Sequence, residues 1–208
     1  MLIVEHFFLI ACDPRTGLPQ WPQAKQDLET LAAAGLILGL ALQERVFLNN
    51  GRLCTDGSLP LGHPLLNEAL RALDGAHDQN VTASIHLLAH RLSPLTEQVL
   101  DGLYRRDLVH RIQTRRWLLF KQVRYPLRSM QSRNEALDHL RAAARGERED
   151  LHGLALLLLA DQSGLLAANL DAFDHERASK RLLELSEPGS QATDTGRIYA
   201  EVRNALLA

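Results

Sequence analysis

The sequence predicts a mainly α-helical protein that forms one domain. Leu and Ala dominate the chain while aromatic residues make up only 5% of it, a composition that favours helices over sheets. The 208 residues are 46% apolar, which is enough to build one hydrophobic core. We therefore expect a single helical domain over residues 1–208, with about eight helices and one or two short β-hairpins.

The first half of the chain is expected to contain five helices and one hairpin. Residues 2–11 predict a buried helix, although β-branched Ile3 and Val4 leave a strand open. Small and apolar residues over 28–42 predict a helix at the centre of a bundle. Asn50-Gly51 favours a type I′ hairpin turn, so strands are expected on either side of it. Further helices are expected near 66–73, 82–92 and 94–105.

The second half begins with a predicted hairpin and continues in helices. Strands are expected at 108–112 and 117–120, joined around 113–115. Ser132 and Glu135 have the spacing of a capping box, which predicts a helix from there to Arg145. The most apolar helix is expected at 151–166. Asp174 is a candidate cap for the helix after it, and a final helix is expected around 198–206.

One basic segment, residues 105–133, stands apart from the rest of the chain. It holds nine Lys and Arg and a single acid, a net charge of +8, whereas the remaining residues sum to −10. Trp117, Phe120 and Tyr125 interrupt the basic residues. A basic and partly apolar segment suits an anionic membrane surface or a nucleic acid. The candidate lipid contacts on charge alone are Arg91, Arg115, Arg116, Lys121, Arg124 and Arg128.

Signals for catalysis are missing from the sequence. The chain has no G-x-G-x-x-G, Walker A, G-x-S-x-G or H-E-x-x-H motif. His86 and His90 are four residues apart on an expected helix, but no carboxylate or Cys stands at a matching position. We therefore expect no enzyme activity, no metal site and no cofactor.

Nucleic-acid binding is the alternative function that the pattern leaves open. Residues 95–106 followed by a basic hairpin resemble the last helix and wing of a winged-helix module. However, that helix carries Glu97 and Asp101 and has no Lys or Arg before Arg105. A helix in the major groove presents donors to phosphates and bases, so this alternative is disfavoured.

The compartment is expected to be the cytoplasm. Cys12 and Cys54 are too few for a disulfide framework, and Glu5 and His6 interrupt the short apolar N-terminal run. The longest apolar run, 153–160, is less than half of what a membrane span of ~20 residues requires. Any membrane contact is therefore expected to be peripheral, on the cytoplasmic face.

Several segments resemble the Golgi phosphoprotein 3 family, which consists of peripheral proteins that recognise phosphatidylinositol 4-phosphate. The opening LIVEHFFL at 2–9 and GLILGLAL at 35–42 carry this likeness. It continues, in order, at 45–48, 64–70, 103–109, 117–120, 125–127 and 154–160. The resemblance therefore covers nearly the whole chain.

This resemblance implies a fold, a mode of assembly and a lipid site. It implies a helical domain around a central apolar helix, here 151–166, and self-association through a projecting hairpin at 109–127 that carries Trp117, Phe120 and Tyr125. Eukaryotic members adapt glycosyltransferases to Golgi membranes, but the sequence names no client protein.

The family's lipid site is expected to be incomplete in this chain. Trp21 matches the family's lipid-site tryptophan, but Ala33, Ser93 and Thr96 stand where the family has arginines. A phosphate head group depends on charge-assisted donors. We therefore expect the fold to be kept and selective phosphoinositide binding to be weakened or lost.

Overall fold

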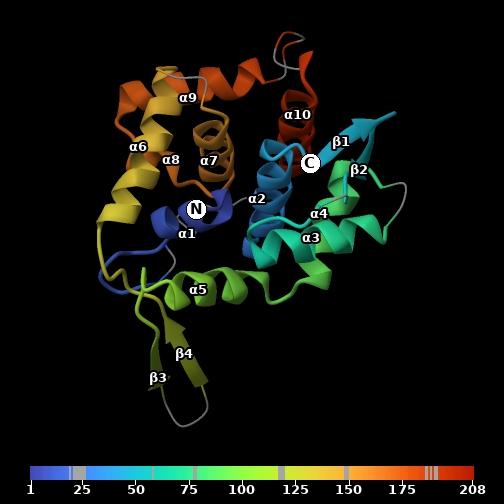
Figure 1. Ribbon diagram of the computed structural model, residues 1–208. Coiled ribbons are helices and arrows are strands. Elements are labelled where there is room, and N and C mark those ends of the chain that lie inside the picture. The colour runs from blue at the N-terminus through green and yellow to red at the C-terminus, as the bar shows by residue number, and fades with distance from the viewer. Residues whose placement is uncertain are drawn as a thin grey trace.

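The computed structural model describes residues 1–208 apart from 19, 21–26, 58, 77–78, 117–119, 148–149, 186, 188 and 190–191, and apart from the side chains of 114–122. Within the described residues there are ten helices and two small antiparallel sheets of two strands each (Figure 1). The prediction of a mainly helical protein with short hairpins is confirmed. None of the described helices is long and apolar enough to cross a membrane.

Three buried helices form the centre of the core. Helix α1 (Ile3–Ala11) is buried at every residue. The strand that the β-branched Ile3 and Val4 left open for this segment is therefore not formed. Helix α2 (Leu28–Leu42) packs against α1, α3, α4, α5, α7 and α10, and α7 (Leu151–Gln162) packs against both α1 and α2. A Cβ atom on Gly35 would lie 3.1 Å from the Val4 Cβ and 3.2 Å from the Leu159 Cδ1. The small residue therefore sets the close approach of all three helices.

Amphipathic helices cover this centre. They are α3 (Pro64–Asp74), α4 (Val81–Arg91), α5 (Leu95–Arg105), α6 (Gln131–Arg145), α8 (Leu166–Asn169), α9 (Ala172–Glu184) and α10 (Asp194–Leu207). In α5, for example, Leu95, Val99 and Leu103 are buried at intervals of four residues, while Glu97 is exposed. Such spacing places one apolar stripe against the core.

Several helix boundaries differ from the sequence prediction. Helix α7 ends at Gln162 rather than at Leu166, because Gly164 has a φ of 74° and turns the chain into α8. Helix α6 begins at Gln131, whose N–H donates to the Ser129 Oγ at 3.2 Å, so Ser132 is inside the helix and not its cap.

The predicted cap of α9 is also wrong. Asp171 caps this helix by accepting from the Asp174 N–H at 2.8 Å. The Asp174 carboxylate is buried and accepts from the Arg145 guanidinium at 2.9–3.0 Å instead. Arg145 on α6 is distant in sequence, so local spacing alone assigned the Asp174 side chain to the helix end.

The two hairpins differ in how well the sequence located them. Strands β1 (Val46–Asn49) and β2 (Arg52–Thr55) pair around Asn50 and Gly51, which have φ values of 50° and 75° as a type I′ turn requires. Strands β3 (Ile112–Arg116) and β4 (Phe120–Arg124) pair with Ile112 opposite Arg124 and Arg116 opposite Phe120. Residues 113–115 are therefore strand rather than turn, and of the predicted strand 117–120 only Phe120, the first residue of β4, lies within the described residues. This second hairpin projects from the body beside the end of α5 (Figure 1).

Candidate functional site

The base of the β3–β4 hairpin is held to the body by backbone pairing. An isolated antiparallel bridge joins Val109 to Leu127, between the two strands and the body of the protein. The His110 N–H donates to the Pro126 carbonyl at 2.8 Å, and the Arg128 N–H donates to the Leu108 carbonyl at 3.0 Å. The pairing of the hairpin therefore continues into the body of the protein.

The loop after α1 clamps the returning strand. The Tyr125 and Leu127 N–H groups donate to the carbonyls of Gly17 and Pro14, each at 3.1 Å. Gly17 has a φ of 65°, and a Cβ atom there would lie 2.1 Å from the Pro126 nitrogen. Only glycine fits this position, because any side chain would collide with the strand.

Tyr125 fixes the hairpin base to α5. Its side chain is 5% exposed, and its hydroxyl donates to the Asp101 Oδ1 at 3.0 Å. Burial, followed by the contact with Asp101, raises the pKa of Tyr125 to about 12, so the hydroxyl remains a donor at neutral pH. We predicted Tyr125 as a self-association residue, but the structure shows it packed within the chain's own core.

The basic residues predicted to contact lipid do not form one group. The Arg128 guanidinium pairs with Asp107 at the hairpin base, and Arg124 is half-buried on β4. Arg91 lies at the end of α4, where its Nη1 donates to the Ala72 carbonyl at 3.2 Å. Helix α5, of eleven residues, separates this site from the hairpin by a length of ~16 Å. Arg91 is thus remote from the hairpin cations.

Other predicted residues lie partly or wholly outside the described part of the chain. The backbones of Arg115 and Lys121 are opposite each other on β3 and β4, and Arg116 is opposite Phe120. The side chains of these four residues are outside the description. Trp21 and Trp117 lie outside the described residues altogether.

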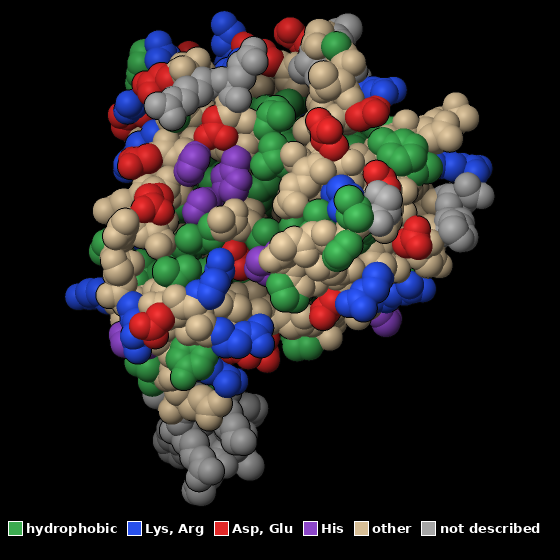
Figure 2. Space-filling model, in the orientation of Figure 1, with side chains coloured by type: hydrophobic (Ala, Val, Ile, Leu, Met, Phe, Trp, Pro, Cys, Tyr) green, Lys and Arg blue, Asp and Glu red, His purple; other side chains and the backbone are tan. Residues whose placement is uncertain are grey.

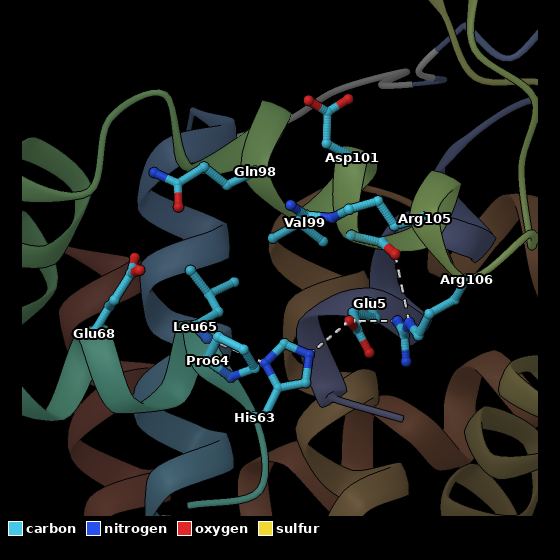
Figure 3. A pocket seen from close by; sticks show the side chains of 11 residues that line it. Glu5, His63, Pro64, Leu65, Glu68, Gln98, Val99, Asp101, Arg105 and Arg106 are labelled. Carbon is cyan, nitrogen blue, oxygen red and sulfur yellow. Dashed lines mark hydrogen bonds and ion pairs between the residues drawn. The ribbon is translucent and has the colours of Figure 1, made fainter.

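A cleft beside the hairpin base contains residues that the sequence analysis did not select. It has a volume of about 500 Å³ and lies between α1, α3 and α5 (Figure 3). Glu5 is 1% exposed, and its carboxylate pairs with Arg106 Nη2 at 2.5 Å and with His63 Nε2 at 3.2 Å. The Leu2 N–H donates to its other oxygen at 2.8 Å. One signal was available, since a carboxylate in a buried helix requires donors, but the sequence did not reveal which residues supply them.

Three histidines meet where α1, α6 and α7 converge. The ring centroids of His6, His139 and His152 are 4.9–5.7 Å apart, and a group of histidines is visible on the face shown in Figure 2. The His6 Nδ1 and His152 Nε2 are 2.8 Å apart, and the His139 Nδ1 is 2.6 Å from the Asp150 Oδ2.

Burial controls the protonation of this histidine cluster. Burial, followed by the charge of a neighbouring histidine, lowers the pKa of His6 to about 3 and that of His152 to about 4. No group of His, Cys, Asp and Glu in the described part of the chain is arranged to hold a metal ion. His86 and His90 lie apart from the cluster, exposed on α4. His6 and His152 are thus uncharged at neutral pH, and they form a hydrogen-bonded contact between α1 and α7.

A family model described as Golgi phosphoprotein 3 (GPP34) matches residues 3–206. The chain belongs to the Golgi phosphoprotein 3 family. The family is generally non-enzymatic. No curated protein matches the chain.

The three positions that the sequence analysis aligned with lipid-site arginines, Ala33, Ser93 and Thr96, carry no cationic side chain. Ala33 is completely buried in α2 and offers no donor. Ser93 is exposed before α5, and Thr96 lies in the first turn of that helix. The N–H groups of Leu95 and Thr96 donate to the two oxygens of Glu29 on α2, at 2.7 and 2.9 Å. A carboxylate of the Golgi phosphoprotein 3 domain itself therefore occupies the helix end, where an anion would otherwise be favoured.

Proposed function

We propose that this Golgi phosphoprotein 3 domain is a non-enzymatic cytoplasmic module that binds anionic membranes peripherally through its β3–β4 hairpin. The observation that carries the proposal is the +8 charge of residues 105–133 in a chain whose other residues sum to −10. The hairpin within this segment projects from the body, and the clamp at Gly17 and Tyr125 fixes its base. A projecting cationic element is suited to reach an anionic surface that the acidic body would avoid.

The expected affinity is low. If four basic residues face the lipid at ~1 kcal/mol each, the gain is ~4 kcal/mol, equivalent to a Kd of ~1 mM. Stable attachment therefore needs a second contribution. We propose that self-association through the hairpin supplies it, because linking two weak contacts raises the overall affinity without new contacts.

Selectivity for phosphatidylinositol 4-phosphate is not part of the proposal. Ala33, Ser93 and Thr96 provide no guanidinium groups for a phosphate monoester. The Glu29 carboxylate already accepts from the first N–H groups of α5, and it would repel an anionic head group at that point. Binding is therefore expected to follow the surface charge of the membrane rather than the identity of the lipid.

Vesicle co-sedimentation tests this proposal. Three vesicle types are needed: phosphatidylcholine alone, and mixtures with phosphatidylserine or with phosphatidylinositol 4-phosphate at equal surface charge. We expect equal binding to both anionic types at ionic strength of about 0.1 M and loss at about 1 M, where the Debye length falls to ~3 Å. Absence of binding at about 0.1 M would contradict the membrane function, and a clear preference for phosphatidylinositol 4-phosphate would contradict the loss of selectivity.

Matched variants locate the membrane contact. The triple variant Arg115→Gln/Arg116→Gln/Lys121→Gln removes three hairpin charges, whereas Arg52→Gln/Arg177→Gln/Lys180→Gln removes three exposed charges elsewhere. Only the hairpin variant is expected to lose binding. Equal losses in both would show that net charge, not the hairpin, is responsible.

Two further measurements address self-association and the nucleic-acid alternative. Analytical ultracentrifugation of Trp117→Ser/Phe120→Ser should show a weaker self-association than the unaltered chain, and an unchanged state would exclude the hairpin as the interface. A gel shift with duplex DNA at the same ionic strength as the vesicle experiment should show no complex. Tighter binding to DNA than to anionic vesicles would favour the winged-helix alternative.

A further inference from the structure

The cleft between α3 and α5 has an apolar floor and a polar rim. Leu65 and Val99, which are 7% and 1% exposed, line it together with Pro64. Its volume of about 500 Å³ lies within the range of small-molecule sites. Figure 3 shows Glu68 on the α3 side, with the Arg105 side chain extending along α5 towards Val99 on the other side.

Most polar groups of the cleft already have partners. The Glu5 carboxylate is paired with Arg106 and His63, as described above. The Asp101 carboxylate accepts from the Tyr125 hydroxyl and lies 3.5 Å from the Arg111 Nε. The Gln98 Nε2 donates to the Leu92 carbonyl at 2.7 Å. These groups therefore have little capacity left for a ligand.

Glu68 and Arg105 are the exceptions. Each lines the cleft, yet neither side chain forms an ion pair or hydrogen bond with any residue in the described ranges, including the other one. Glu68 is moreover half-buried, and a half-buried carboxylate without a donor is unfavourable. The cleft thus presents one unpaired anion and one unpaired cation on opposite walls, with apolar surface between them.

We propose that this cleft binds a small zwitterion of the phosphoethanolamine class. Its ammonium group pairs with Glu68, its phosphate pairs with Arg105, and its two-carbon linker passes over Val99. A ligand with one charge would satisfy one wall and be repelled by the other. The side chains of Glu68 and Arg105 do not contact each other. An α-amino acid carries its two charged groups on one carbon and is too short to pair with both side chains. Arginine also favours phosphate, because its planar fork matches the phosphate oxygens.

This chemistry occurs both in a soluble phosphorylated amine and in a zwitterionic lipid head group. The cleft is lined by the C-terminal half of α5, from Gln98 onward. The β3–β4 hairpin follows that end of α5 in the chain. A lipid source would therefore lie close to the proposed membrane contact. The proposed recognition does not depend on the membrane contact, since none of the described side chains of β3 and β4 lines the cleft.

Isothermal titration calorimetry with soluble phosphoethanolamine tests the proposal. Inorganic phosphate, ethylamine and phosphocholine are the comparison ligands, since the first two lack one charge and the third has no ammonium N–H to donate. Glu68→Gln and Arg105→Gln should each weaken phosphoethanolamine binding by about tenfold. Glu97→Gln and Arg71→Gln remove exposed charges from the same two helices and should leave it unchanged.

Several outcomes would overturn the inference. One is that phosphoethanolamine does not bind at millimolar concentration. Others are equal binding of inorganic phosphate, or equal losses in the control variants. Because Glu68 and Arg105 lack partners among the described residues, both variants should keep the unfolding temperature of the parent chain, and a lost fold would not be mistaken for lost binding.

A parallel experiment with vesicles identifies whether the ligand is a lipid or a soluble molecule. Binding to phosphatidylethanolamine vesicles that Glu68→Gln abolishes assigns the site to a lipid, whereas binding of the soluble probe alone assigns it to a free phosphorylated amine. The hairpin charge variant should bind soluble phosphoethanolamine normally, so the membrane proposal can fail while this inference stands.

Discussion

Acidification from about pH 7.5 to about pH 5 should destabilise the protein through the histidine cluster. His6 is 6% exposed, and its pKa is lowered to about 3 in the folded protein from an ordinary value of 6.5. Between these two values the unfolded chain binds a proton that the folded chain does not. The free energy of unfolding therefore falls as the pH drops below 6.5, by about 1.4 kcal/mol per pH unit for each such group. By pH 5, His6 alone accounts for about 2 kcal/mol.

The surroundings of His6 explain the direction of this effect. Burial is the largest cause of the lowered pKa of His6, and the His152 ring, the N-terminal amine, His139 and Arg106 add to it by disfavouring a positive charge on His6. The His6 Nδ1 and His152 Nε2, 2.8 Å apart, also require one nitrogen to stay unprotonated. Asp150 and Asp174 have lowered pKa values, so their contributions are lost only below their unfolded pKa of 3.8, outside this window.

Urea unfolding followed by far-ultraviolet circular dichroism measures the effect at a series of pH values. The variant His6→Gln keeps a hydrogen-bonding side chain but cannot titrate, so its free energy of unfolding should depend less steeply on pH. His86→Gln changes an exposed histidine of α4 and should retain the slope of the parent chain. A flat profile for the parent chain, or the same slope in His6→Gln, would refute the burial argument.

Three substitutions test the clamp at the hairpin base and the contact of Glu29 with the first N–H groups of α5. Each is measured by thermal or urea unfolding. Gly17→Ala should cost about 2 to 4 kcal/mol, because the new Cβ atom collides with Pro126; a loss below about 1 kcal/mol would show that the loop adjusts freely. Tyr125→Phe should cost about 1 kcal/mol, because the half-buried Asp101 carboxylate loses the hydrogen bond from the hydroxyl, and an unchanged stability would show that the hydroxyl is not part of the clamp. Glu29→Ala should cost about 1 to 2 kcal/mol, since two N–H groups of α5 lose their acceptor; binding of anionic vesicles should not decrease, and a decrease would place Glu29 in the membrane contact.

Local signals predicted most of the fold. Apolar spacing located the helices, because the residues of one buried helix face recur every three or four positions within the same segment. Helix α5 shows this with Leu95, Val99 and Leu103. The turn at Asn50-Gly51 was equally local, because these residues adopt positive φ angles readily. Such features depend on neighbours only a few residues away, so a single sequence contains them.

The failures have two different physical reasons. The polar run 113–115 resembled a turn, but its residues pair with 121–123 of the next strand, and a two-stranded ribbon that projects from the body does not require an apolar residue at every second position. Asp174 resembled a cap, but its carboxylate pairs with Arg145 of another helix. Local spacing could not reveal this partner, because it is distant in sequence.

The candidate site was predicted in part, because charge counting treats every arginine as available. The structure pairs Arg106 with Glu5, Arg111 with Asp101 and Arg128 with Asp107. These three pairs reduce the charge outside β3 and β4 that is available to a membrane, so the proposed membrane contact is the hairpin rather than the whole of residues 105–133. Sequence alone located the charged segment but not this division within it.

The length of the hairpin explains how a chain with a net charge of −2 could bind an anionic surface. Each strand has five residues, which at ~3.3 Å per residue gives a length of ~16 Å. At ionic strength of about 0.1 M the Debye length is ~10 Å, so the acidic body behind the hairpin is largely screened from a membrane at its tip. At about 0.01 M the Debye length grows to ~30 Å, and repulsion of the body then reaches the membrane.

Vesicle binding should therefore be strongest at an intermediate ionic strength, because repulsion of the body weakens it at low salt and screening of the hairpin weakens it at high salt. Co-sedimentation across the range from about 0.01 M to about 1 M measures this profile directly. The control variant lacking Arg52, Arg177 and Lys180 makes the body more acidic, so its optimum should move to higher salt. A steady increase in binding down to the lowest salt would show that the body does not oppose the contact, and the spacing argument would then be wrong.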